Sequence, residues 1–289
     1  MHIAFLGFGL IAGSIARAVR SNPLTSDWAI VAWSPSGDGP RQALADGVVD
    51  VAAAAPEAAL SGADVVVLAA PATACLTLID RLGGPWRTLL THDAVVTDVA
   101  STKGSVVARA DAARLRFVGG HPMAGLETGG YGAASADLFV DRPWVVVPGT
   151  LAVPADVQRV ADLAVACSAH VVSMDAAAHD RAVAGISHLP LVLAAALVES
   201  VAGRTADDWP TAASLAAGGW RDTTRVARGD PAMGAAIVVT NAPALAARLR
   251  DVRNVLDAWL AELERPDGPD EAAVHERLAA ARAVLEDRP

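Results

Sequence analysis

A glycine-rich turn near the N-terminus has the residue types that bind a dinucleotide. Gly7, Gly9 and Ala12 form the pattern G-x-G-x-x-A directly after the apolar run 2–6 and open a helix-like segment. Gly7 permits a tight turn, Gly9 lets the backbone approach a pyrophosphate, and the small Ala12 lets the helix pack on the strand. A tight turn without a ligand is the less favoured alternative, because the pattern stands at the first strand–helix junction. The residues predicted to bind the cofactor here are Gly7, Gly9, Leu10, Ile11 and Ala12.

The end of the second apolar run, 29–33, indicates which dinucleotide binds. At this position an acidic residue commonly holds the ribose hydroxyl of NAD, and here the residue is Ser34. Without that carboxylate a 2′-phosphate is not repelled, and we expect Ser34, Ser36 and Arg41 to bind it. The sequence therefore favours NADP over NAD. The alternative is that this loop only turns the chain and that either cofactor binds.

Four further segments of the chain carry reactive side chains. They are residues 98–104, 119–125, 186–190 and 220–225. The second of them reads Gly-Gly-His-Pro-Met-Ala-Gly around His121, and an imidazole titrates near neutral pH. The last contains Arg225, whose guanidinium is a planar, two-pronged donor that suits a carboxylate. Proton transfer and anion binding are the chemistry that these groups allow.

Strands that alternate with helices are needed to bring these segments together. Apolar runs rich in β-branched residues occur at 2–6, 29–33, 64–70, 94–99, 117–120, 144–147 and 170–174. Continuous runs, rather than strict alternation, indicate strands that are buried on both faces. With helices between them, they predict an α/β fold with a doubly wound parallel sheet of the Rossmann type. His121 comes just after one such run, at the sheet edge where ligands bind.

The second half of the chain has a different character. Ala- and Leu-rich helix-like segments cover 183–200, 212–217, 235–260 and 271–286. We therefore expect a dinucleotide-binding domain at residues 1–174 and an all-helical domain at residues 175–289.

Composition excludes several classes of protein. The chain has 289 residues, 53% of them hydrophobic and 19% charged, so it is not disordered throughout. Its formal net charge of −9 argues against binding to nucleic acid or to an anionic membrane surface. No uninterrupted apolar stretch of about 18 residues and no leader-like N-terminus stand out, so we expect a cytoplasmic protein without a membrane span. Cys75 and Cys167 are expected to be small buried hydrophobes, and the histidines show no metal-ligand spacing.

Taken together and in order, the glycine turn and the four segments resemble the prephenate/arogenate dehydrogenase family of tyrosine biosynthesis. The resemblance runs from residue 1 to about residue 260 and implies an NAD(P)-dependent oxidative decarboxylation. Hydride leaves the carbinol carbon of a cyclohexadienol for the nicotinamide, and carbon dioxide departs as the ring becomes aromatic. Arogenate gives tyrosine, and prephenate gives 4-hydroxyphenylpyruvate.

The resemblance also implies roles for individual residues. His121 matches the family's catalytic histidine, which polarises or deprotonates the substrate hydroxyl, and Ser101 matches a serine that orients that hydroxyl and also lies by the cofactor. Arg225 matches the arginine that binds a substrate carboxylate. Arg221 is a second candidate, but a structural salt bridge, for example with Asp222, is favoured for it. His188 matches a histidine that either shapes the substrate pocket or is a hydrogen-bonded core residue.

Two more residues of these motifs have open interpretations. Lys103 either adds positive potential or is a solvated lysine. Glu127 sits where many family members carry an acid after the His-Pro motif, and we interpret it as supporting the site.

Two departures from the family pattern favour one substrate. Many members read His-Leu-Pro-His where this chain has Leu191, and many carry a tryptophan where this chain has Gly234. Both features look like the NADP-using arogenate dehydrogenases, so we expect arogenate and NADP. The helical half resembles the family's dimerisation domain, which implies a homodimer.

Two other functions share part of this pattern. A β-hydroxyacid-type dehydrogenase also joins a dinucleotide fold to a helical domain, but its catalytic lysine lies in the helical half, and this chain has no lysine after Lys103. A non-catalytic NADP-sensing protein would keep the glycine turn but need not keep His121, Ser101 and Arg225. Both are therefore less favoured.

Overall fold

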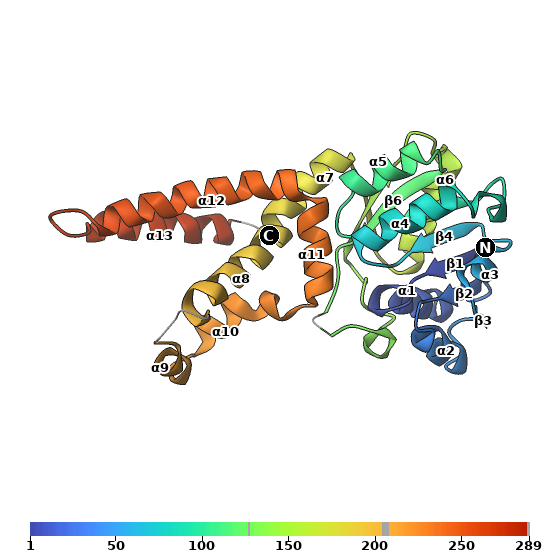
Figure 1. Ribbon diagram of the computed structural model, residues 1–289, viewed down its shortest axis with the longest axis horizontal. Helices are drawn as coiled ribbons and strands as arrows, with labels where there is room; N and C mark the ends of the chain where they lie inside the picture. Colours follow the sequence, from blue (N-terminus) through green and yellow to red (C-terminus); the bar gives the residue numbers. More distant parts are fainter. Residues whose placement is uncertain (127, 204–207, 288–289) are drawn as a thin grey trace. The chain divides into compact units, whose positions relative to one another are not determined.

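The structure is a computed structural model that describes residues 1–126, 128–203 and 208–287. The chain forms two compact units, Met1–Leu245 and Ala246–Pro289. Figure 1 shows the first unit as a sheet wrapped by helices, followed by a set of further helices.

One eight-stranded sheet, in the order β3-β2-β1-β4-β5-β6-β7-β8, forms the centre of the first unit. Its strands are β1 (His2–Leu6), β2 (Ala29–Trp33), β3 (Val51–Ala52), β4 (Val65–Leu68), β5 (Val95–Asp98), β6 (Phe117–Pro122), β7 (Pro143–Pro148) and β8 (His170–Ser173). The predicted doubly wound α/β fold is confirmed, with one departure from a parallel sheet. β6 and β7 pair antiparallel, with His121 opposite Val145.

Helices cover both faces of this sheet, as the buried apolar runs require. On one face Ile15 and Val19 of α1 pack with Leu163 of α6 against the strands. On the other face Ile79 of α4 and Val106 of α5 pack against them. The helices around the sheet are α1 (Leu10–Ser21), α2 (Asp38–Ala45), α3 (Pro56–Leu60), α4 (Ala72–Gly83), α5 (Gly104–Ala112) and α6 (Pro154–Ala166). Cys75 and Cys167 are buried free thiols, as expected.

After β8 the chain is helical, which the sequence also predicts. The elements up to the end of the first unit are α7 (Ala176–Val183), a π-helical turn η3 (Ala184–His188), α8 (Leu189–Ala202), α9 (Trp209–Ser214), α10 (Gly218–Thr224), a 3-10 turn η4 (Arg225–Arg228) and α11 (Pro231–Thr240). The expected helix 235–260 is interrupted at Asn241, whose side chain is buried and hydrogen-bonded. A new helix, α12 (Ala242–Leu263), starts there and continues into the second unit.

The second unit is a helical hairpin. α13 (Glu271–Glu286) follows the polar turn after α12, and the Asp270 carboxylate caps it by accepting a hydrogen bond from the Ala272 N–H at 2.9 Å. Within the unit the Arg277 guanidinium lies 4.0 Å from the centre of the Trp259 ring. This cation–π contact ties the two helices together.

One helical stretch is long and apolar enough to cross a membrane by length and composition alone, which the sequence reading did not anticipate. It covers Ala176–Ala202, has a mean hydropathy of 1.8, and is only 22% buried over its most apolar window. Its N-terminal part carries the buried polar residues His179, Asp180 and His188. Those side chains bind groups of the sheet and of neighbouring helices, as described below.

Candidate active site

The glycine turn has the shape that a dinucleotide needs. Gly7 has a φ of 94°, and a Cβ there would lie 2.3 Å from the Ala69 carbonyl oxygen, so only glycine fits. A Cβ on Gly9 would meet nothing within 4 Å, which leaves open space in front of the α1 N-terminus. Gly9, Leu10 and Ile11 line a cavity. Ala12 is fully buried on the face of α1 that packs into the core. The turn therefore fits a pyrophosphate on the first N–H groups of α1.

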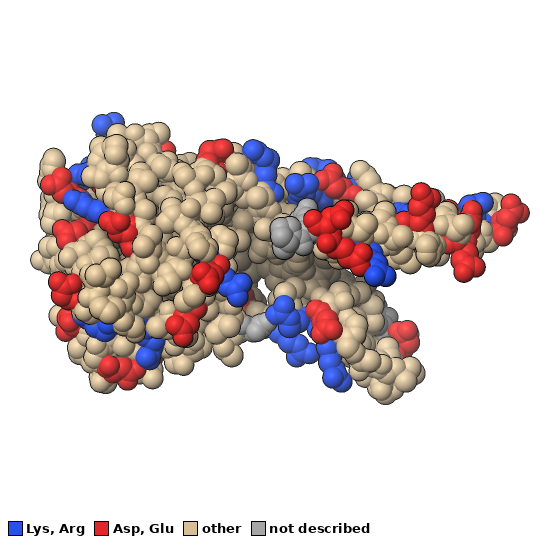
Figure 2. All heavy atoms as spheres, turned by 180° about the vertical axis from the view of Figure 1, so that it is seen from behind, with Lys and Arg blue, Asp and Glu red and all other residues tan. Residues whose placement is uncertain are grey.

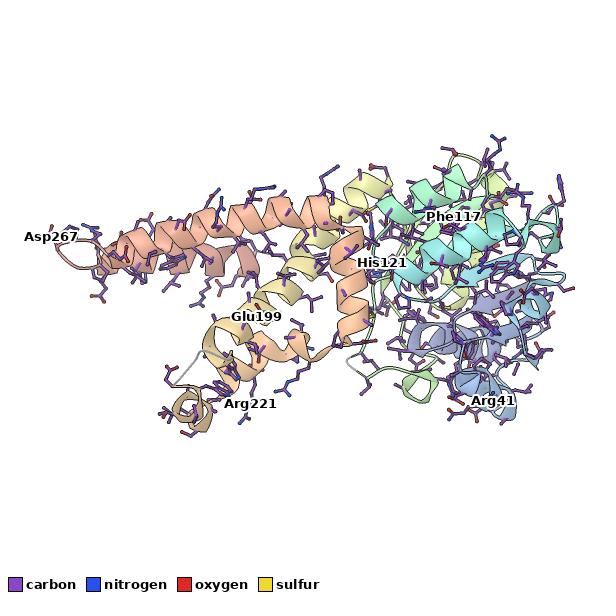
Figure 3. All side chains as sticks on the ribbon, in the orientation of Figure 1. Arg41, Phe117, His121, Glu199, Arg221 and Asp267 are labelled. Carbon is purple, nitrogen blue, oxygen red and sulfur yellow. The ribbon has the colours of Figure 1, made fainter. Side chains whose placement is uncertain are left out.

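The loop after β2 places Ser34, Ser36 and Arg41 at one strand end but outside the lining of that cavity. The Gly37 N–H donates to the Ser34 hydroxyl at 3.2 Å, and the Asp38 N–H donates to the Ser36 hydroxyl at 3.2 Å. The Arg41 guanidinium lies 2.6 Å from the Asp38 carboxylate and also donates to the Ser36 carbonyl. This pair is largely exposed on α2, where Figure 3 labels Arg41.

The cavity itself has a volume of about 300 Å³ and lies where the sheet meets α11. Three groups of residues line it: the glycine turn, the strand ends after β4, β5 and β6, and the start of α11. They include Gly9, Ala70, Ser101, His121, Gly125, Asp230, Met233 and Ile237. Figure 3 shows His121 at the end of the sheet that faces α11. The structure thus brings His121 and Ser101 together beside the glycine turn.

His121 lies within β6 rather than just after it, and it is 8% exposed. Its Nδ1 is 2.8 Å from the Nε2 of His179. Burial holds the pKa of His121 well below its usual value, and the positive charge of Lys103 acts in the same direction. The imidazole is therefore neutral at neutral pH and able to accept a proton.

Sequence reasoning missed the two residues behind His121. His179 and Asp180 follow each other on α7, and the His179 Nδ1 lies 2.7 Å from the Asp180 carboxylate. Burial raises the pKa of Asp180, but hydrogen bonds from His179 and from the N–H groups of Lys103 and Gly104 outweigh it and lower the pKa overall. No spacing pattern links this His-Asp pair to a histidine 58 residues earlier.

Lys103 is completely buried, so the solvated alternative is wrong. Its ammonium group binds the Asp98 carboxylate, and both side chains are 0% exposed. Asp98 also accepts the N–H of Ala100 at 3.0 Å and that of Gly120 at 3.2 Å. The pair therefore ties the strand β5 to the neighbouring β6 just before His121.

His188 lies in the π-helical turn and is 1% exposed. The Asn241 amide bridges it to the Asp180 carbonyl, at 3.1 Å from His188 Nδ1 and 2.9 Å from the carbonyl oxygen. Burial lowers the pKa of His188, and Asp180 and the Ser101 backbone partly offset that effect. His188 does not line the cavity. It belongs to a buried polar cluster, which consists of His121, His179, Asp180, His188 and Asn241.

Arg225 begins the turn η4, between α10 and the cavity-lining residues Gly229 and Asp230. Its side chain is exposed and is not among the residues that line the cavity. Figure 2 shows basic side chains over the α10–η4 segment, where Arg221, Arg225 and Arg228 are exposed. Within the described residues, no ion pair joins Arg221 to Asp222, so the partner given as an example for Arg221 is wrong. Glu127 lies outside the described residues.

Metal binding has no support in the described part of the chain, where no group of three or more His, Cys, Asp or Glu side chains is arranged to hold an ion.

Two family profiles match successive parts of the chain. The profile of the prephenate dehydrogenase nucleotide-binding domain matches residues 15–173, and that of the prephenate dehydrogenase dimerization domain matches residues 175–278. The chain belongs to the prephenate dehydrogenase family. It is thus a nicotinamide-dependent dehydrogenase that acts on a small molecule.

Individual relatives cover nearly the whole chain. The prephenate dehydrogenase of Bacillus subtilis is 33% identical over 266 residues, which are 91% of this chain and 68% of that protein. The Synechocystis arogenate dehydrogenase structure is 29% identical, with a TM-score of 0.80 over 99% of both chains. The A. aeolicus prephenate dehydrogenase, solved with hydroxyphenyl propionate and NAD+, shares the fold, with 23% identity and a TM-score of 0.88 over 100% of this chain and 98% of that one.

Proposed function

We propose that this prephenate dehydrogenase family member oxidatively decarboxylates arogenate, in preference to prephenate, with NADP as the favoured cofactor. The observation that carries the proposal is the position of His121. Its ring lines the cavity beside the glycine turn, with Ser101 on the neighbouring strand end. A neutral imidazole at that point is a hydrogen-bond acceptor for the hydroxyl of a bound cyclohexadienol.

In this mechanism the glycine turn, Ser101 and His121 each have a separate role. Bound nicotinamide supplies the hydride acceptor. The turn from Gly7 to Ala12 would hold the cofactor pyrophosphate on the first N–H groups of α1. Ser101 orients the substrate hydroxyl, and His121 polarises it or takes its proton as hydride leaves the same carbon. Loss of the ring carboxylate as carbon dioxide then makes the ring aromatic.

The NADP preference rests on the loop after β2. Two hydroxyls, Ser34 and Ser36, and the guanidinium of Arg41 gather there within one turn. The ion pair between Arg41 and Asp38 is exposed, and such pairs contribute little stability, so a 2′-phosphate can replace the carboxylate at small cost.

The arogenate preference rests on the two departures from the family pattern. The structure places these positions in contact, since a Cβ on Gly234 would lie 3.5 Å from the Leu191 Cδ2. Gly234 is on α11, which lines the cavity through Met233 and Ile237. Leu191 and Gly234 do not line the cavity themselves, so the absence of an imidazole and of an indole there would act on the pocket through α11.

Arg225 is proposed to bind a substrate carboxylate, and His188 to support the pocket from behind. We expect Arg225→Lys to raise KM for the substrate about tenfold while kcat changes little, because a lysine keeps the charge but loses the bidentate geometry. Steady-state kinetics with NADP held constant measures this, and Arg228→Lys on the same turn is the matched control. An unchanged KM would remove Arg225 from the binding site.

A homodimer is proposed from the helical half. Large apolar side chains of η3 and α11 are exposed, with Ile186 at 69% and Val239 at 67%. The apolar helix Ala176–Ala202 is largely uncovered within one chain, and a second copy would bury it. A division into domains at residues 1–174 and 175–289 and a cytoplasmic location belong to the same proposal.

An initial-rate assay that pairs arogenate or prephenate with NADP or NAD tests the proposed function. We expect the highest kcat/KM with arogenate and NADP. A preference for prephenate with NAD would contradict the interpretation of Ser34, Leu191 and Gly234 and leave the family intact. Absence of turnover in all four combinations, from folded protein that binds the cofactor, would contradict the proposed reaction.

A further inference from the structure

The inner nitrogen of His121 faces a buried chain of polar groups rather than the cavity. From His121 Nδ1 it is 2.8 Å to His179 Nε2, and from His179 Nδ1 it is 2.7 Å to the Asp180 carboxylate. His179 is 1% exposed and the Asp180 side chain 11%. The three side chains come from β6 and α7. Their hydrogen bonds therefore form where α7, the first helix of the helical half, packs on the sheet.

Backbone N–H groups fix the direction of the hydrogen bonds that link His121, His179 and Asp180. The N–H of Lys103 donates to Asp180 Oδ1 and the N–H of Gly104 to Oδ2, each at 2.7 Å. A Cβ on Gly104 would lie 2.8 Å from Oδ2, so glycine is needed for this approach. Both oxygens therefore face donors at the N-terminus of α5, where a negative charge is stabilised. Asp180 is consequently an ionised, acceptor-only carboxylate.

The proton positions on the two rings follow from that assignment. Because Asp180 only accepts, a neutral His179 carries its single proton on Nδ1 and has an unprotonated Nε2. Because that Nε2 is an acceptor, His121 must carry its proton on Nδ1. The remaining nitrogen of His121, Nε2, is then an acceptor available to the cavity.

The other charged groups around His121 do not disturb this order. The Lys103 ammonium group binds the Asp98 carboxylate rather than either histidine ring. His188 is held by Asn241, which donates to its Nδ1. Asp180 is therefore the carboxylate whose charge remains to balance a positive charge that develops on the two histidines.

We propose that His179 and Asp180 are positioning residues for the dehydrogenation, which hold His121 in the Nδ1–H tautomer and stabilise its imidazolium. The inference rests on the proposed function. When the substrate is oxidised, the hydroxyl proton moves to His121 Nε2, hydride moves to the nicotinamide, and the ring carboxylate leaves as carbon dioxide. The electron pair released with carbon dioxide makes the ring an aromatic phenolate, which takes the proton back from His121 Nε2. Until then the Asp180 carboxylate compensates the charge of the imidazolium through His179, by the same logic as a Ser-His-Asp triad.

Two substitutions at one position separate positioning from packing. His179→Gln offers a side-chain carbonyl that can accept the His121 Nδ1–H, whereas His179→Leu offers none. We expect kcat to fall about 100-fold or more in His179→Leu and clearly less in His179→Gln, with KM for NADP unchanged in both. His92→Gln, at a histidine whose side chain is 96% exposed, is the control.

The ring tautomer is a second readout, independent of turnover. Nitrogen-15 NMR of the histidine rings in the wild-type protein without substrate should show His121 protonated on Nδ1, and His179→Leu should lose that preference. A wild-type His121 protonated on Nε2, or a His179→Leu variant with kcat within threefold of wild type, would overturn the proposal. If neither substrate turns over while the tautomer is as expected, the proposed reaction fails and the positioning assignment stands.

Discussion

Replacement of His121 by glutamine is expected to lower kcat by about 10²- to 10⁴-fold, the usual contribution of a positioned general base. Glutamine fills a similar volume and keeps hydrogen-bonding capacity, but it cannot take a proton. The ring lines the cavity without being part of the glycine turn, so the affinity for NADP should hardly change. Single-turnover rates and a fluorescence titration with reduced cofactor measure the two effects separately.

The matched control for this variant is Ser135→Ala, an exchange at a residue that does not line the cavity and whose side chain is not part of the polar cluster. It should keep near wild-type kcat. If His121→Gln also turned over at a near wild-type rate, His121 would not be the proton acceptor. A parallel loss of NADP affinity would instead place the residue in the cofactor site.

The pH dependence follows from the lowered pKa of His121. A histidine that stays neutral in the folded enzyme keeps accepting protons from substrate at pH 6.5, so kcat/KM should fall only at more acidic pH. In the unfolded chain the same histidine binds a proton below about pH 6.5. The unfolded state then carries more protons, and the free energy of unfolding falls with acidification by up to about 1.4 kcal/mol per pH unit. His121→Gln should flatten this slope.

The sequence predicts well those features that depend on neighbouring residues. It also predicts those that follow from one rule, namely that the carboxyl ends of parallel strands lie at the same edge of a sheet. The glycine turn is a contiguous pattern, and its geometry depends on residues that stand side by side. Ser101 and His121 meet because β5 and β6 are neighbours whose carboxyl ends lie at one edge. Apolar runs do not encode strand direction, however, so the antiparallel pairing of β6 with β7 could not be predicted from them.

What the sequence does not show is how the helical half completes the site. His179 and Asp180 have no periodic or motif relation to His121, and only the packing of α7 on the sheet brings them together. Asn241 interrupts an otherwise continuous helical pattern because its amide binds Asp180 and His188. The unusual position of Lys103 could have been suspected from the sequence, since it is the only lysine among 289 residues. The other long cationic side chains of the sequence are arginines, whereas the single lysine is fully buried, where its compact ammonium group is enclosed.

Replacement of Lys103 by methionine is expected to lower the free energy of unfolding by about 3–5 kcal/mol, because it leaves the Asp98 carboxylate buried without its cation. Methionine matches the length of the lysine stem, so loss of packing contributes little. Arg109→Met on the same helix is the control, since Arg109 binds Asp80 at 3.0 Å with both side chains about half exposed. That exposed pair should account for less than about 1 kcal/mol. Urea denaturation of both variants measures the difference.

The same substitution should also reach the chemistry of the site. The Lys103 ammonium lowers the pKa of His121, so its removal raises that pKa towards the ordinary value. The acidic limb of kcat/KM should therefore move to higher pH in Lys103→Met and stay in place in Arg109→Met. Equal stabilities for the two variants, with equal pH profiles, would contradict the buried ion pair. A shift in the pH profile together with the loss of stability would show that a single buried lysine both joins β5 to α5 and keeps the neighbouring histidine neutral.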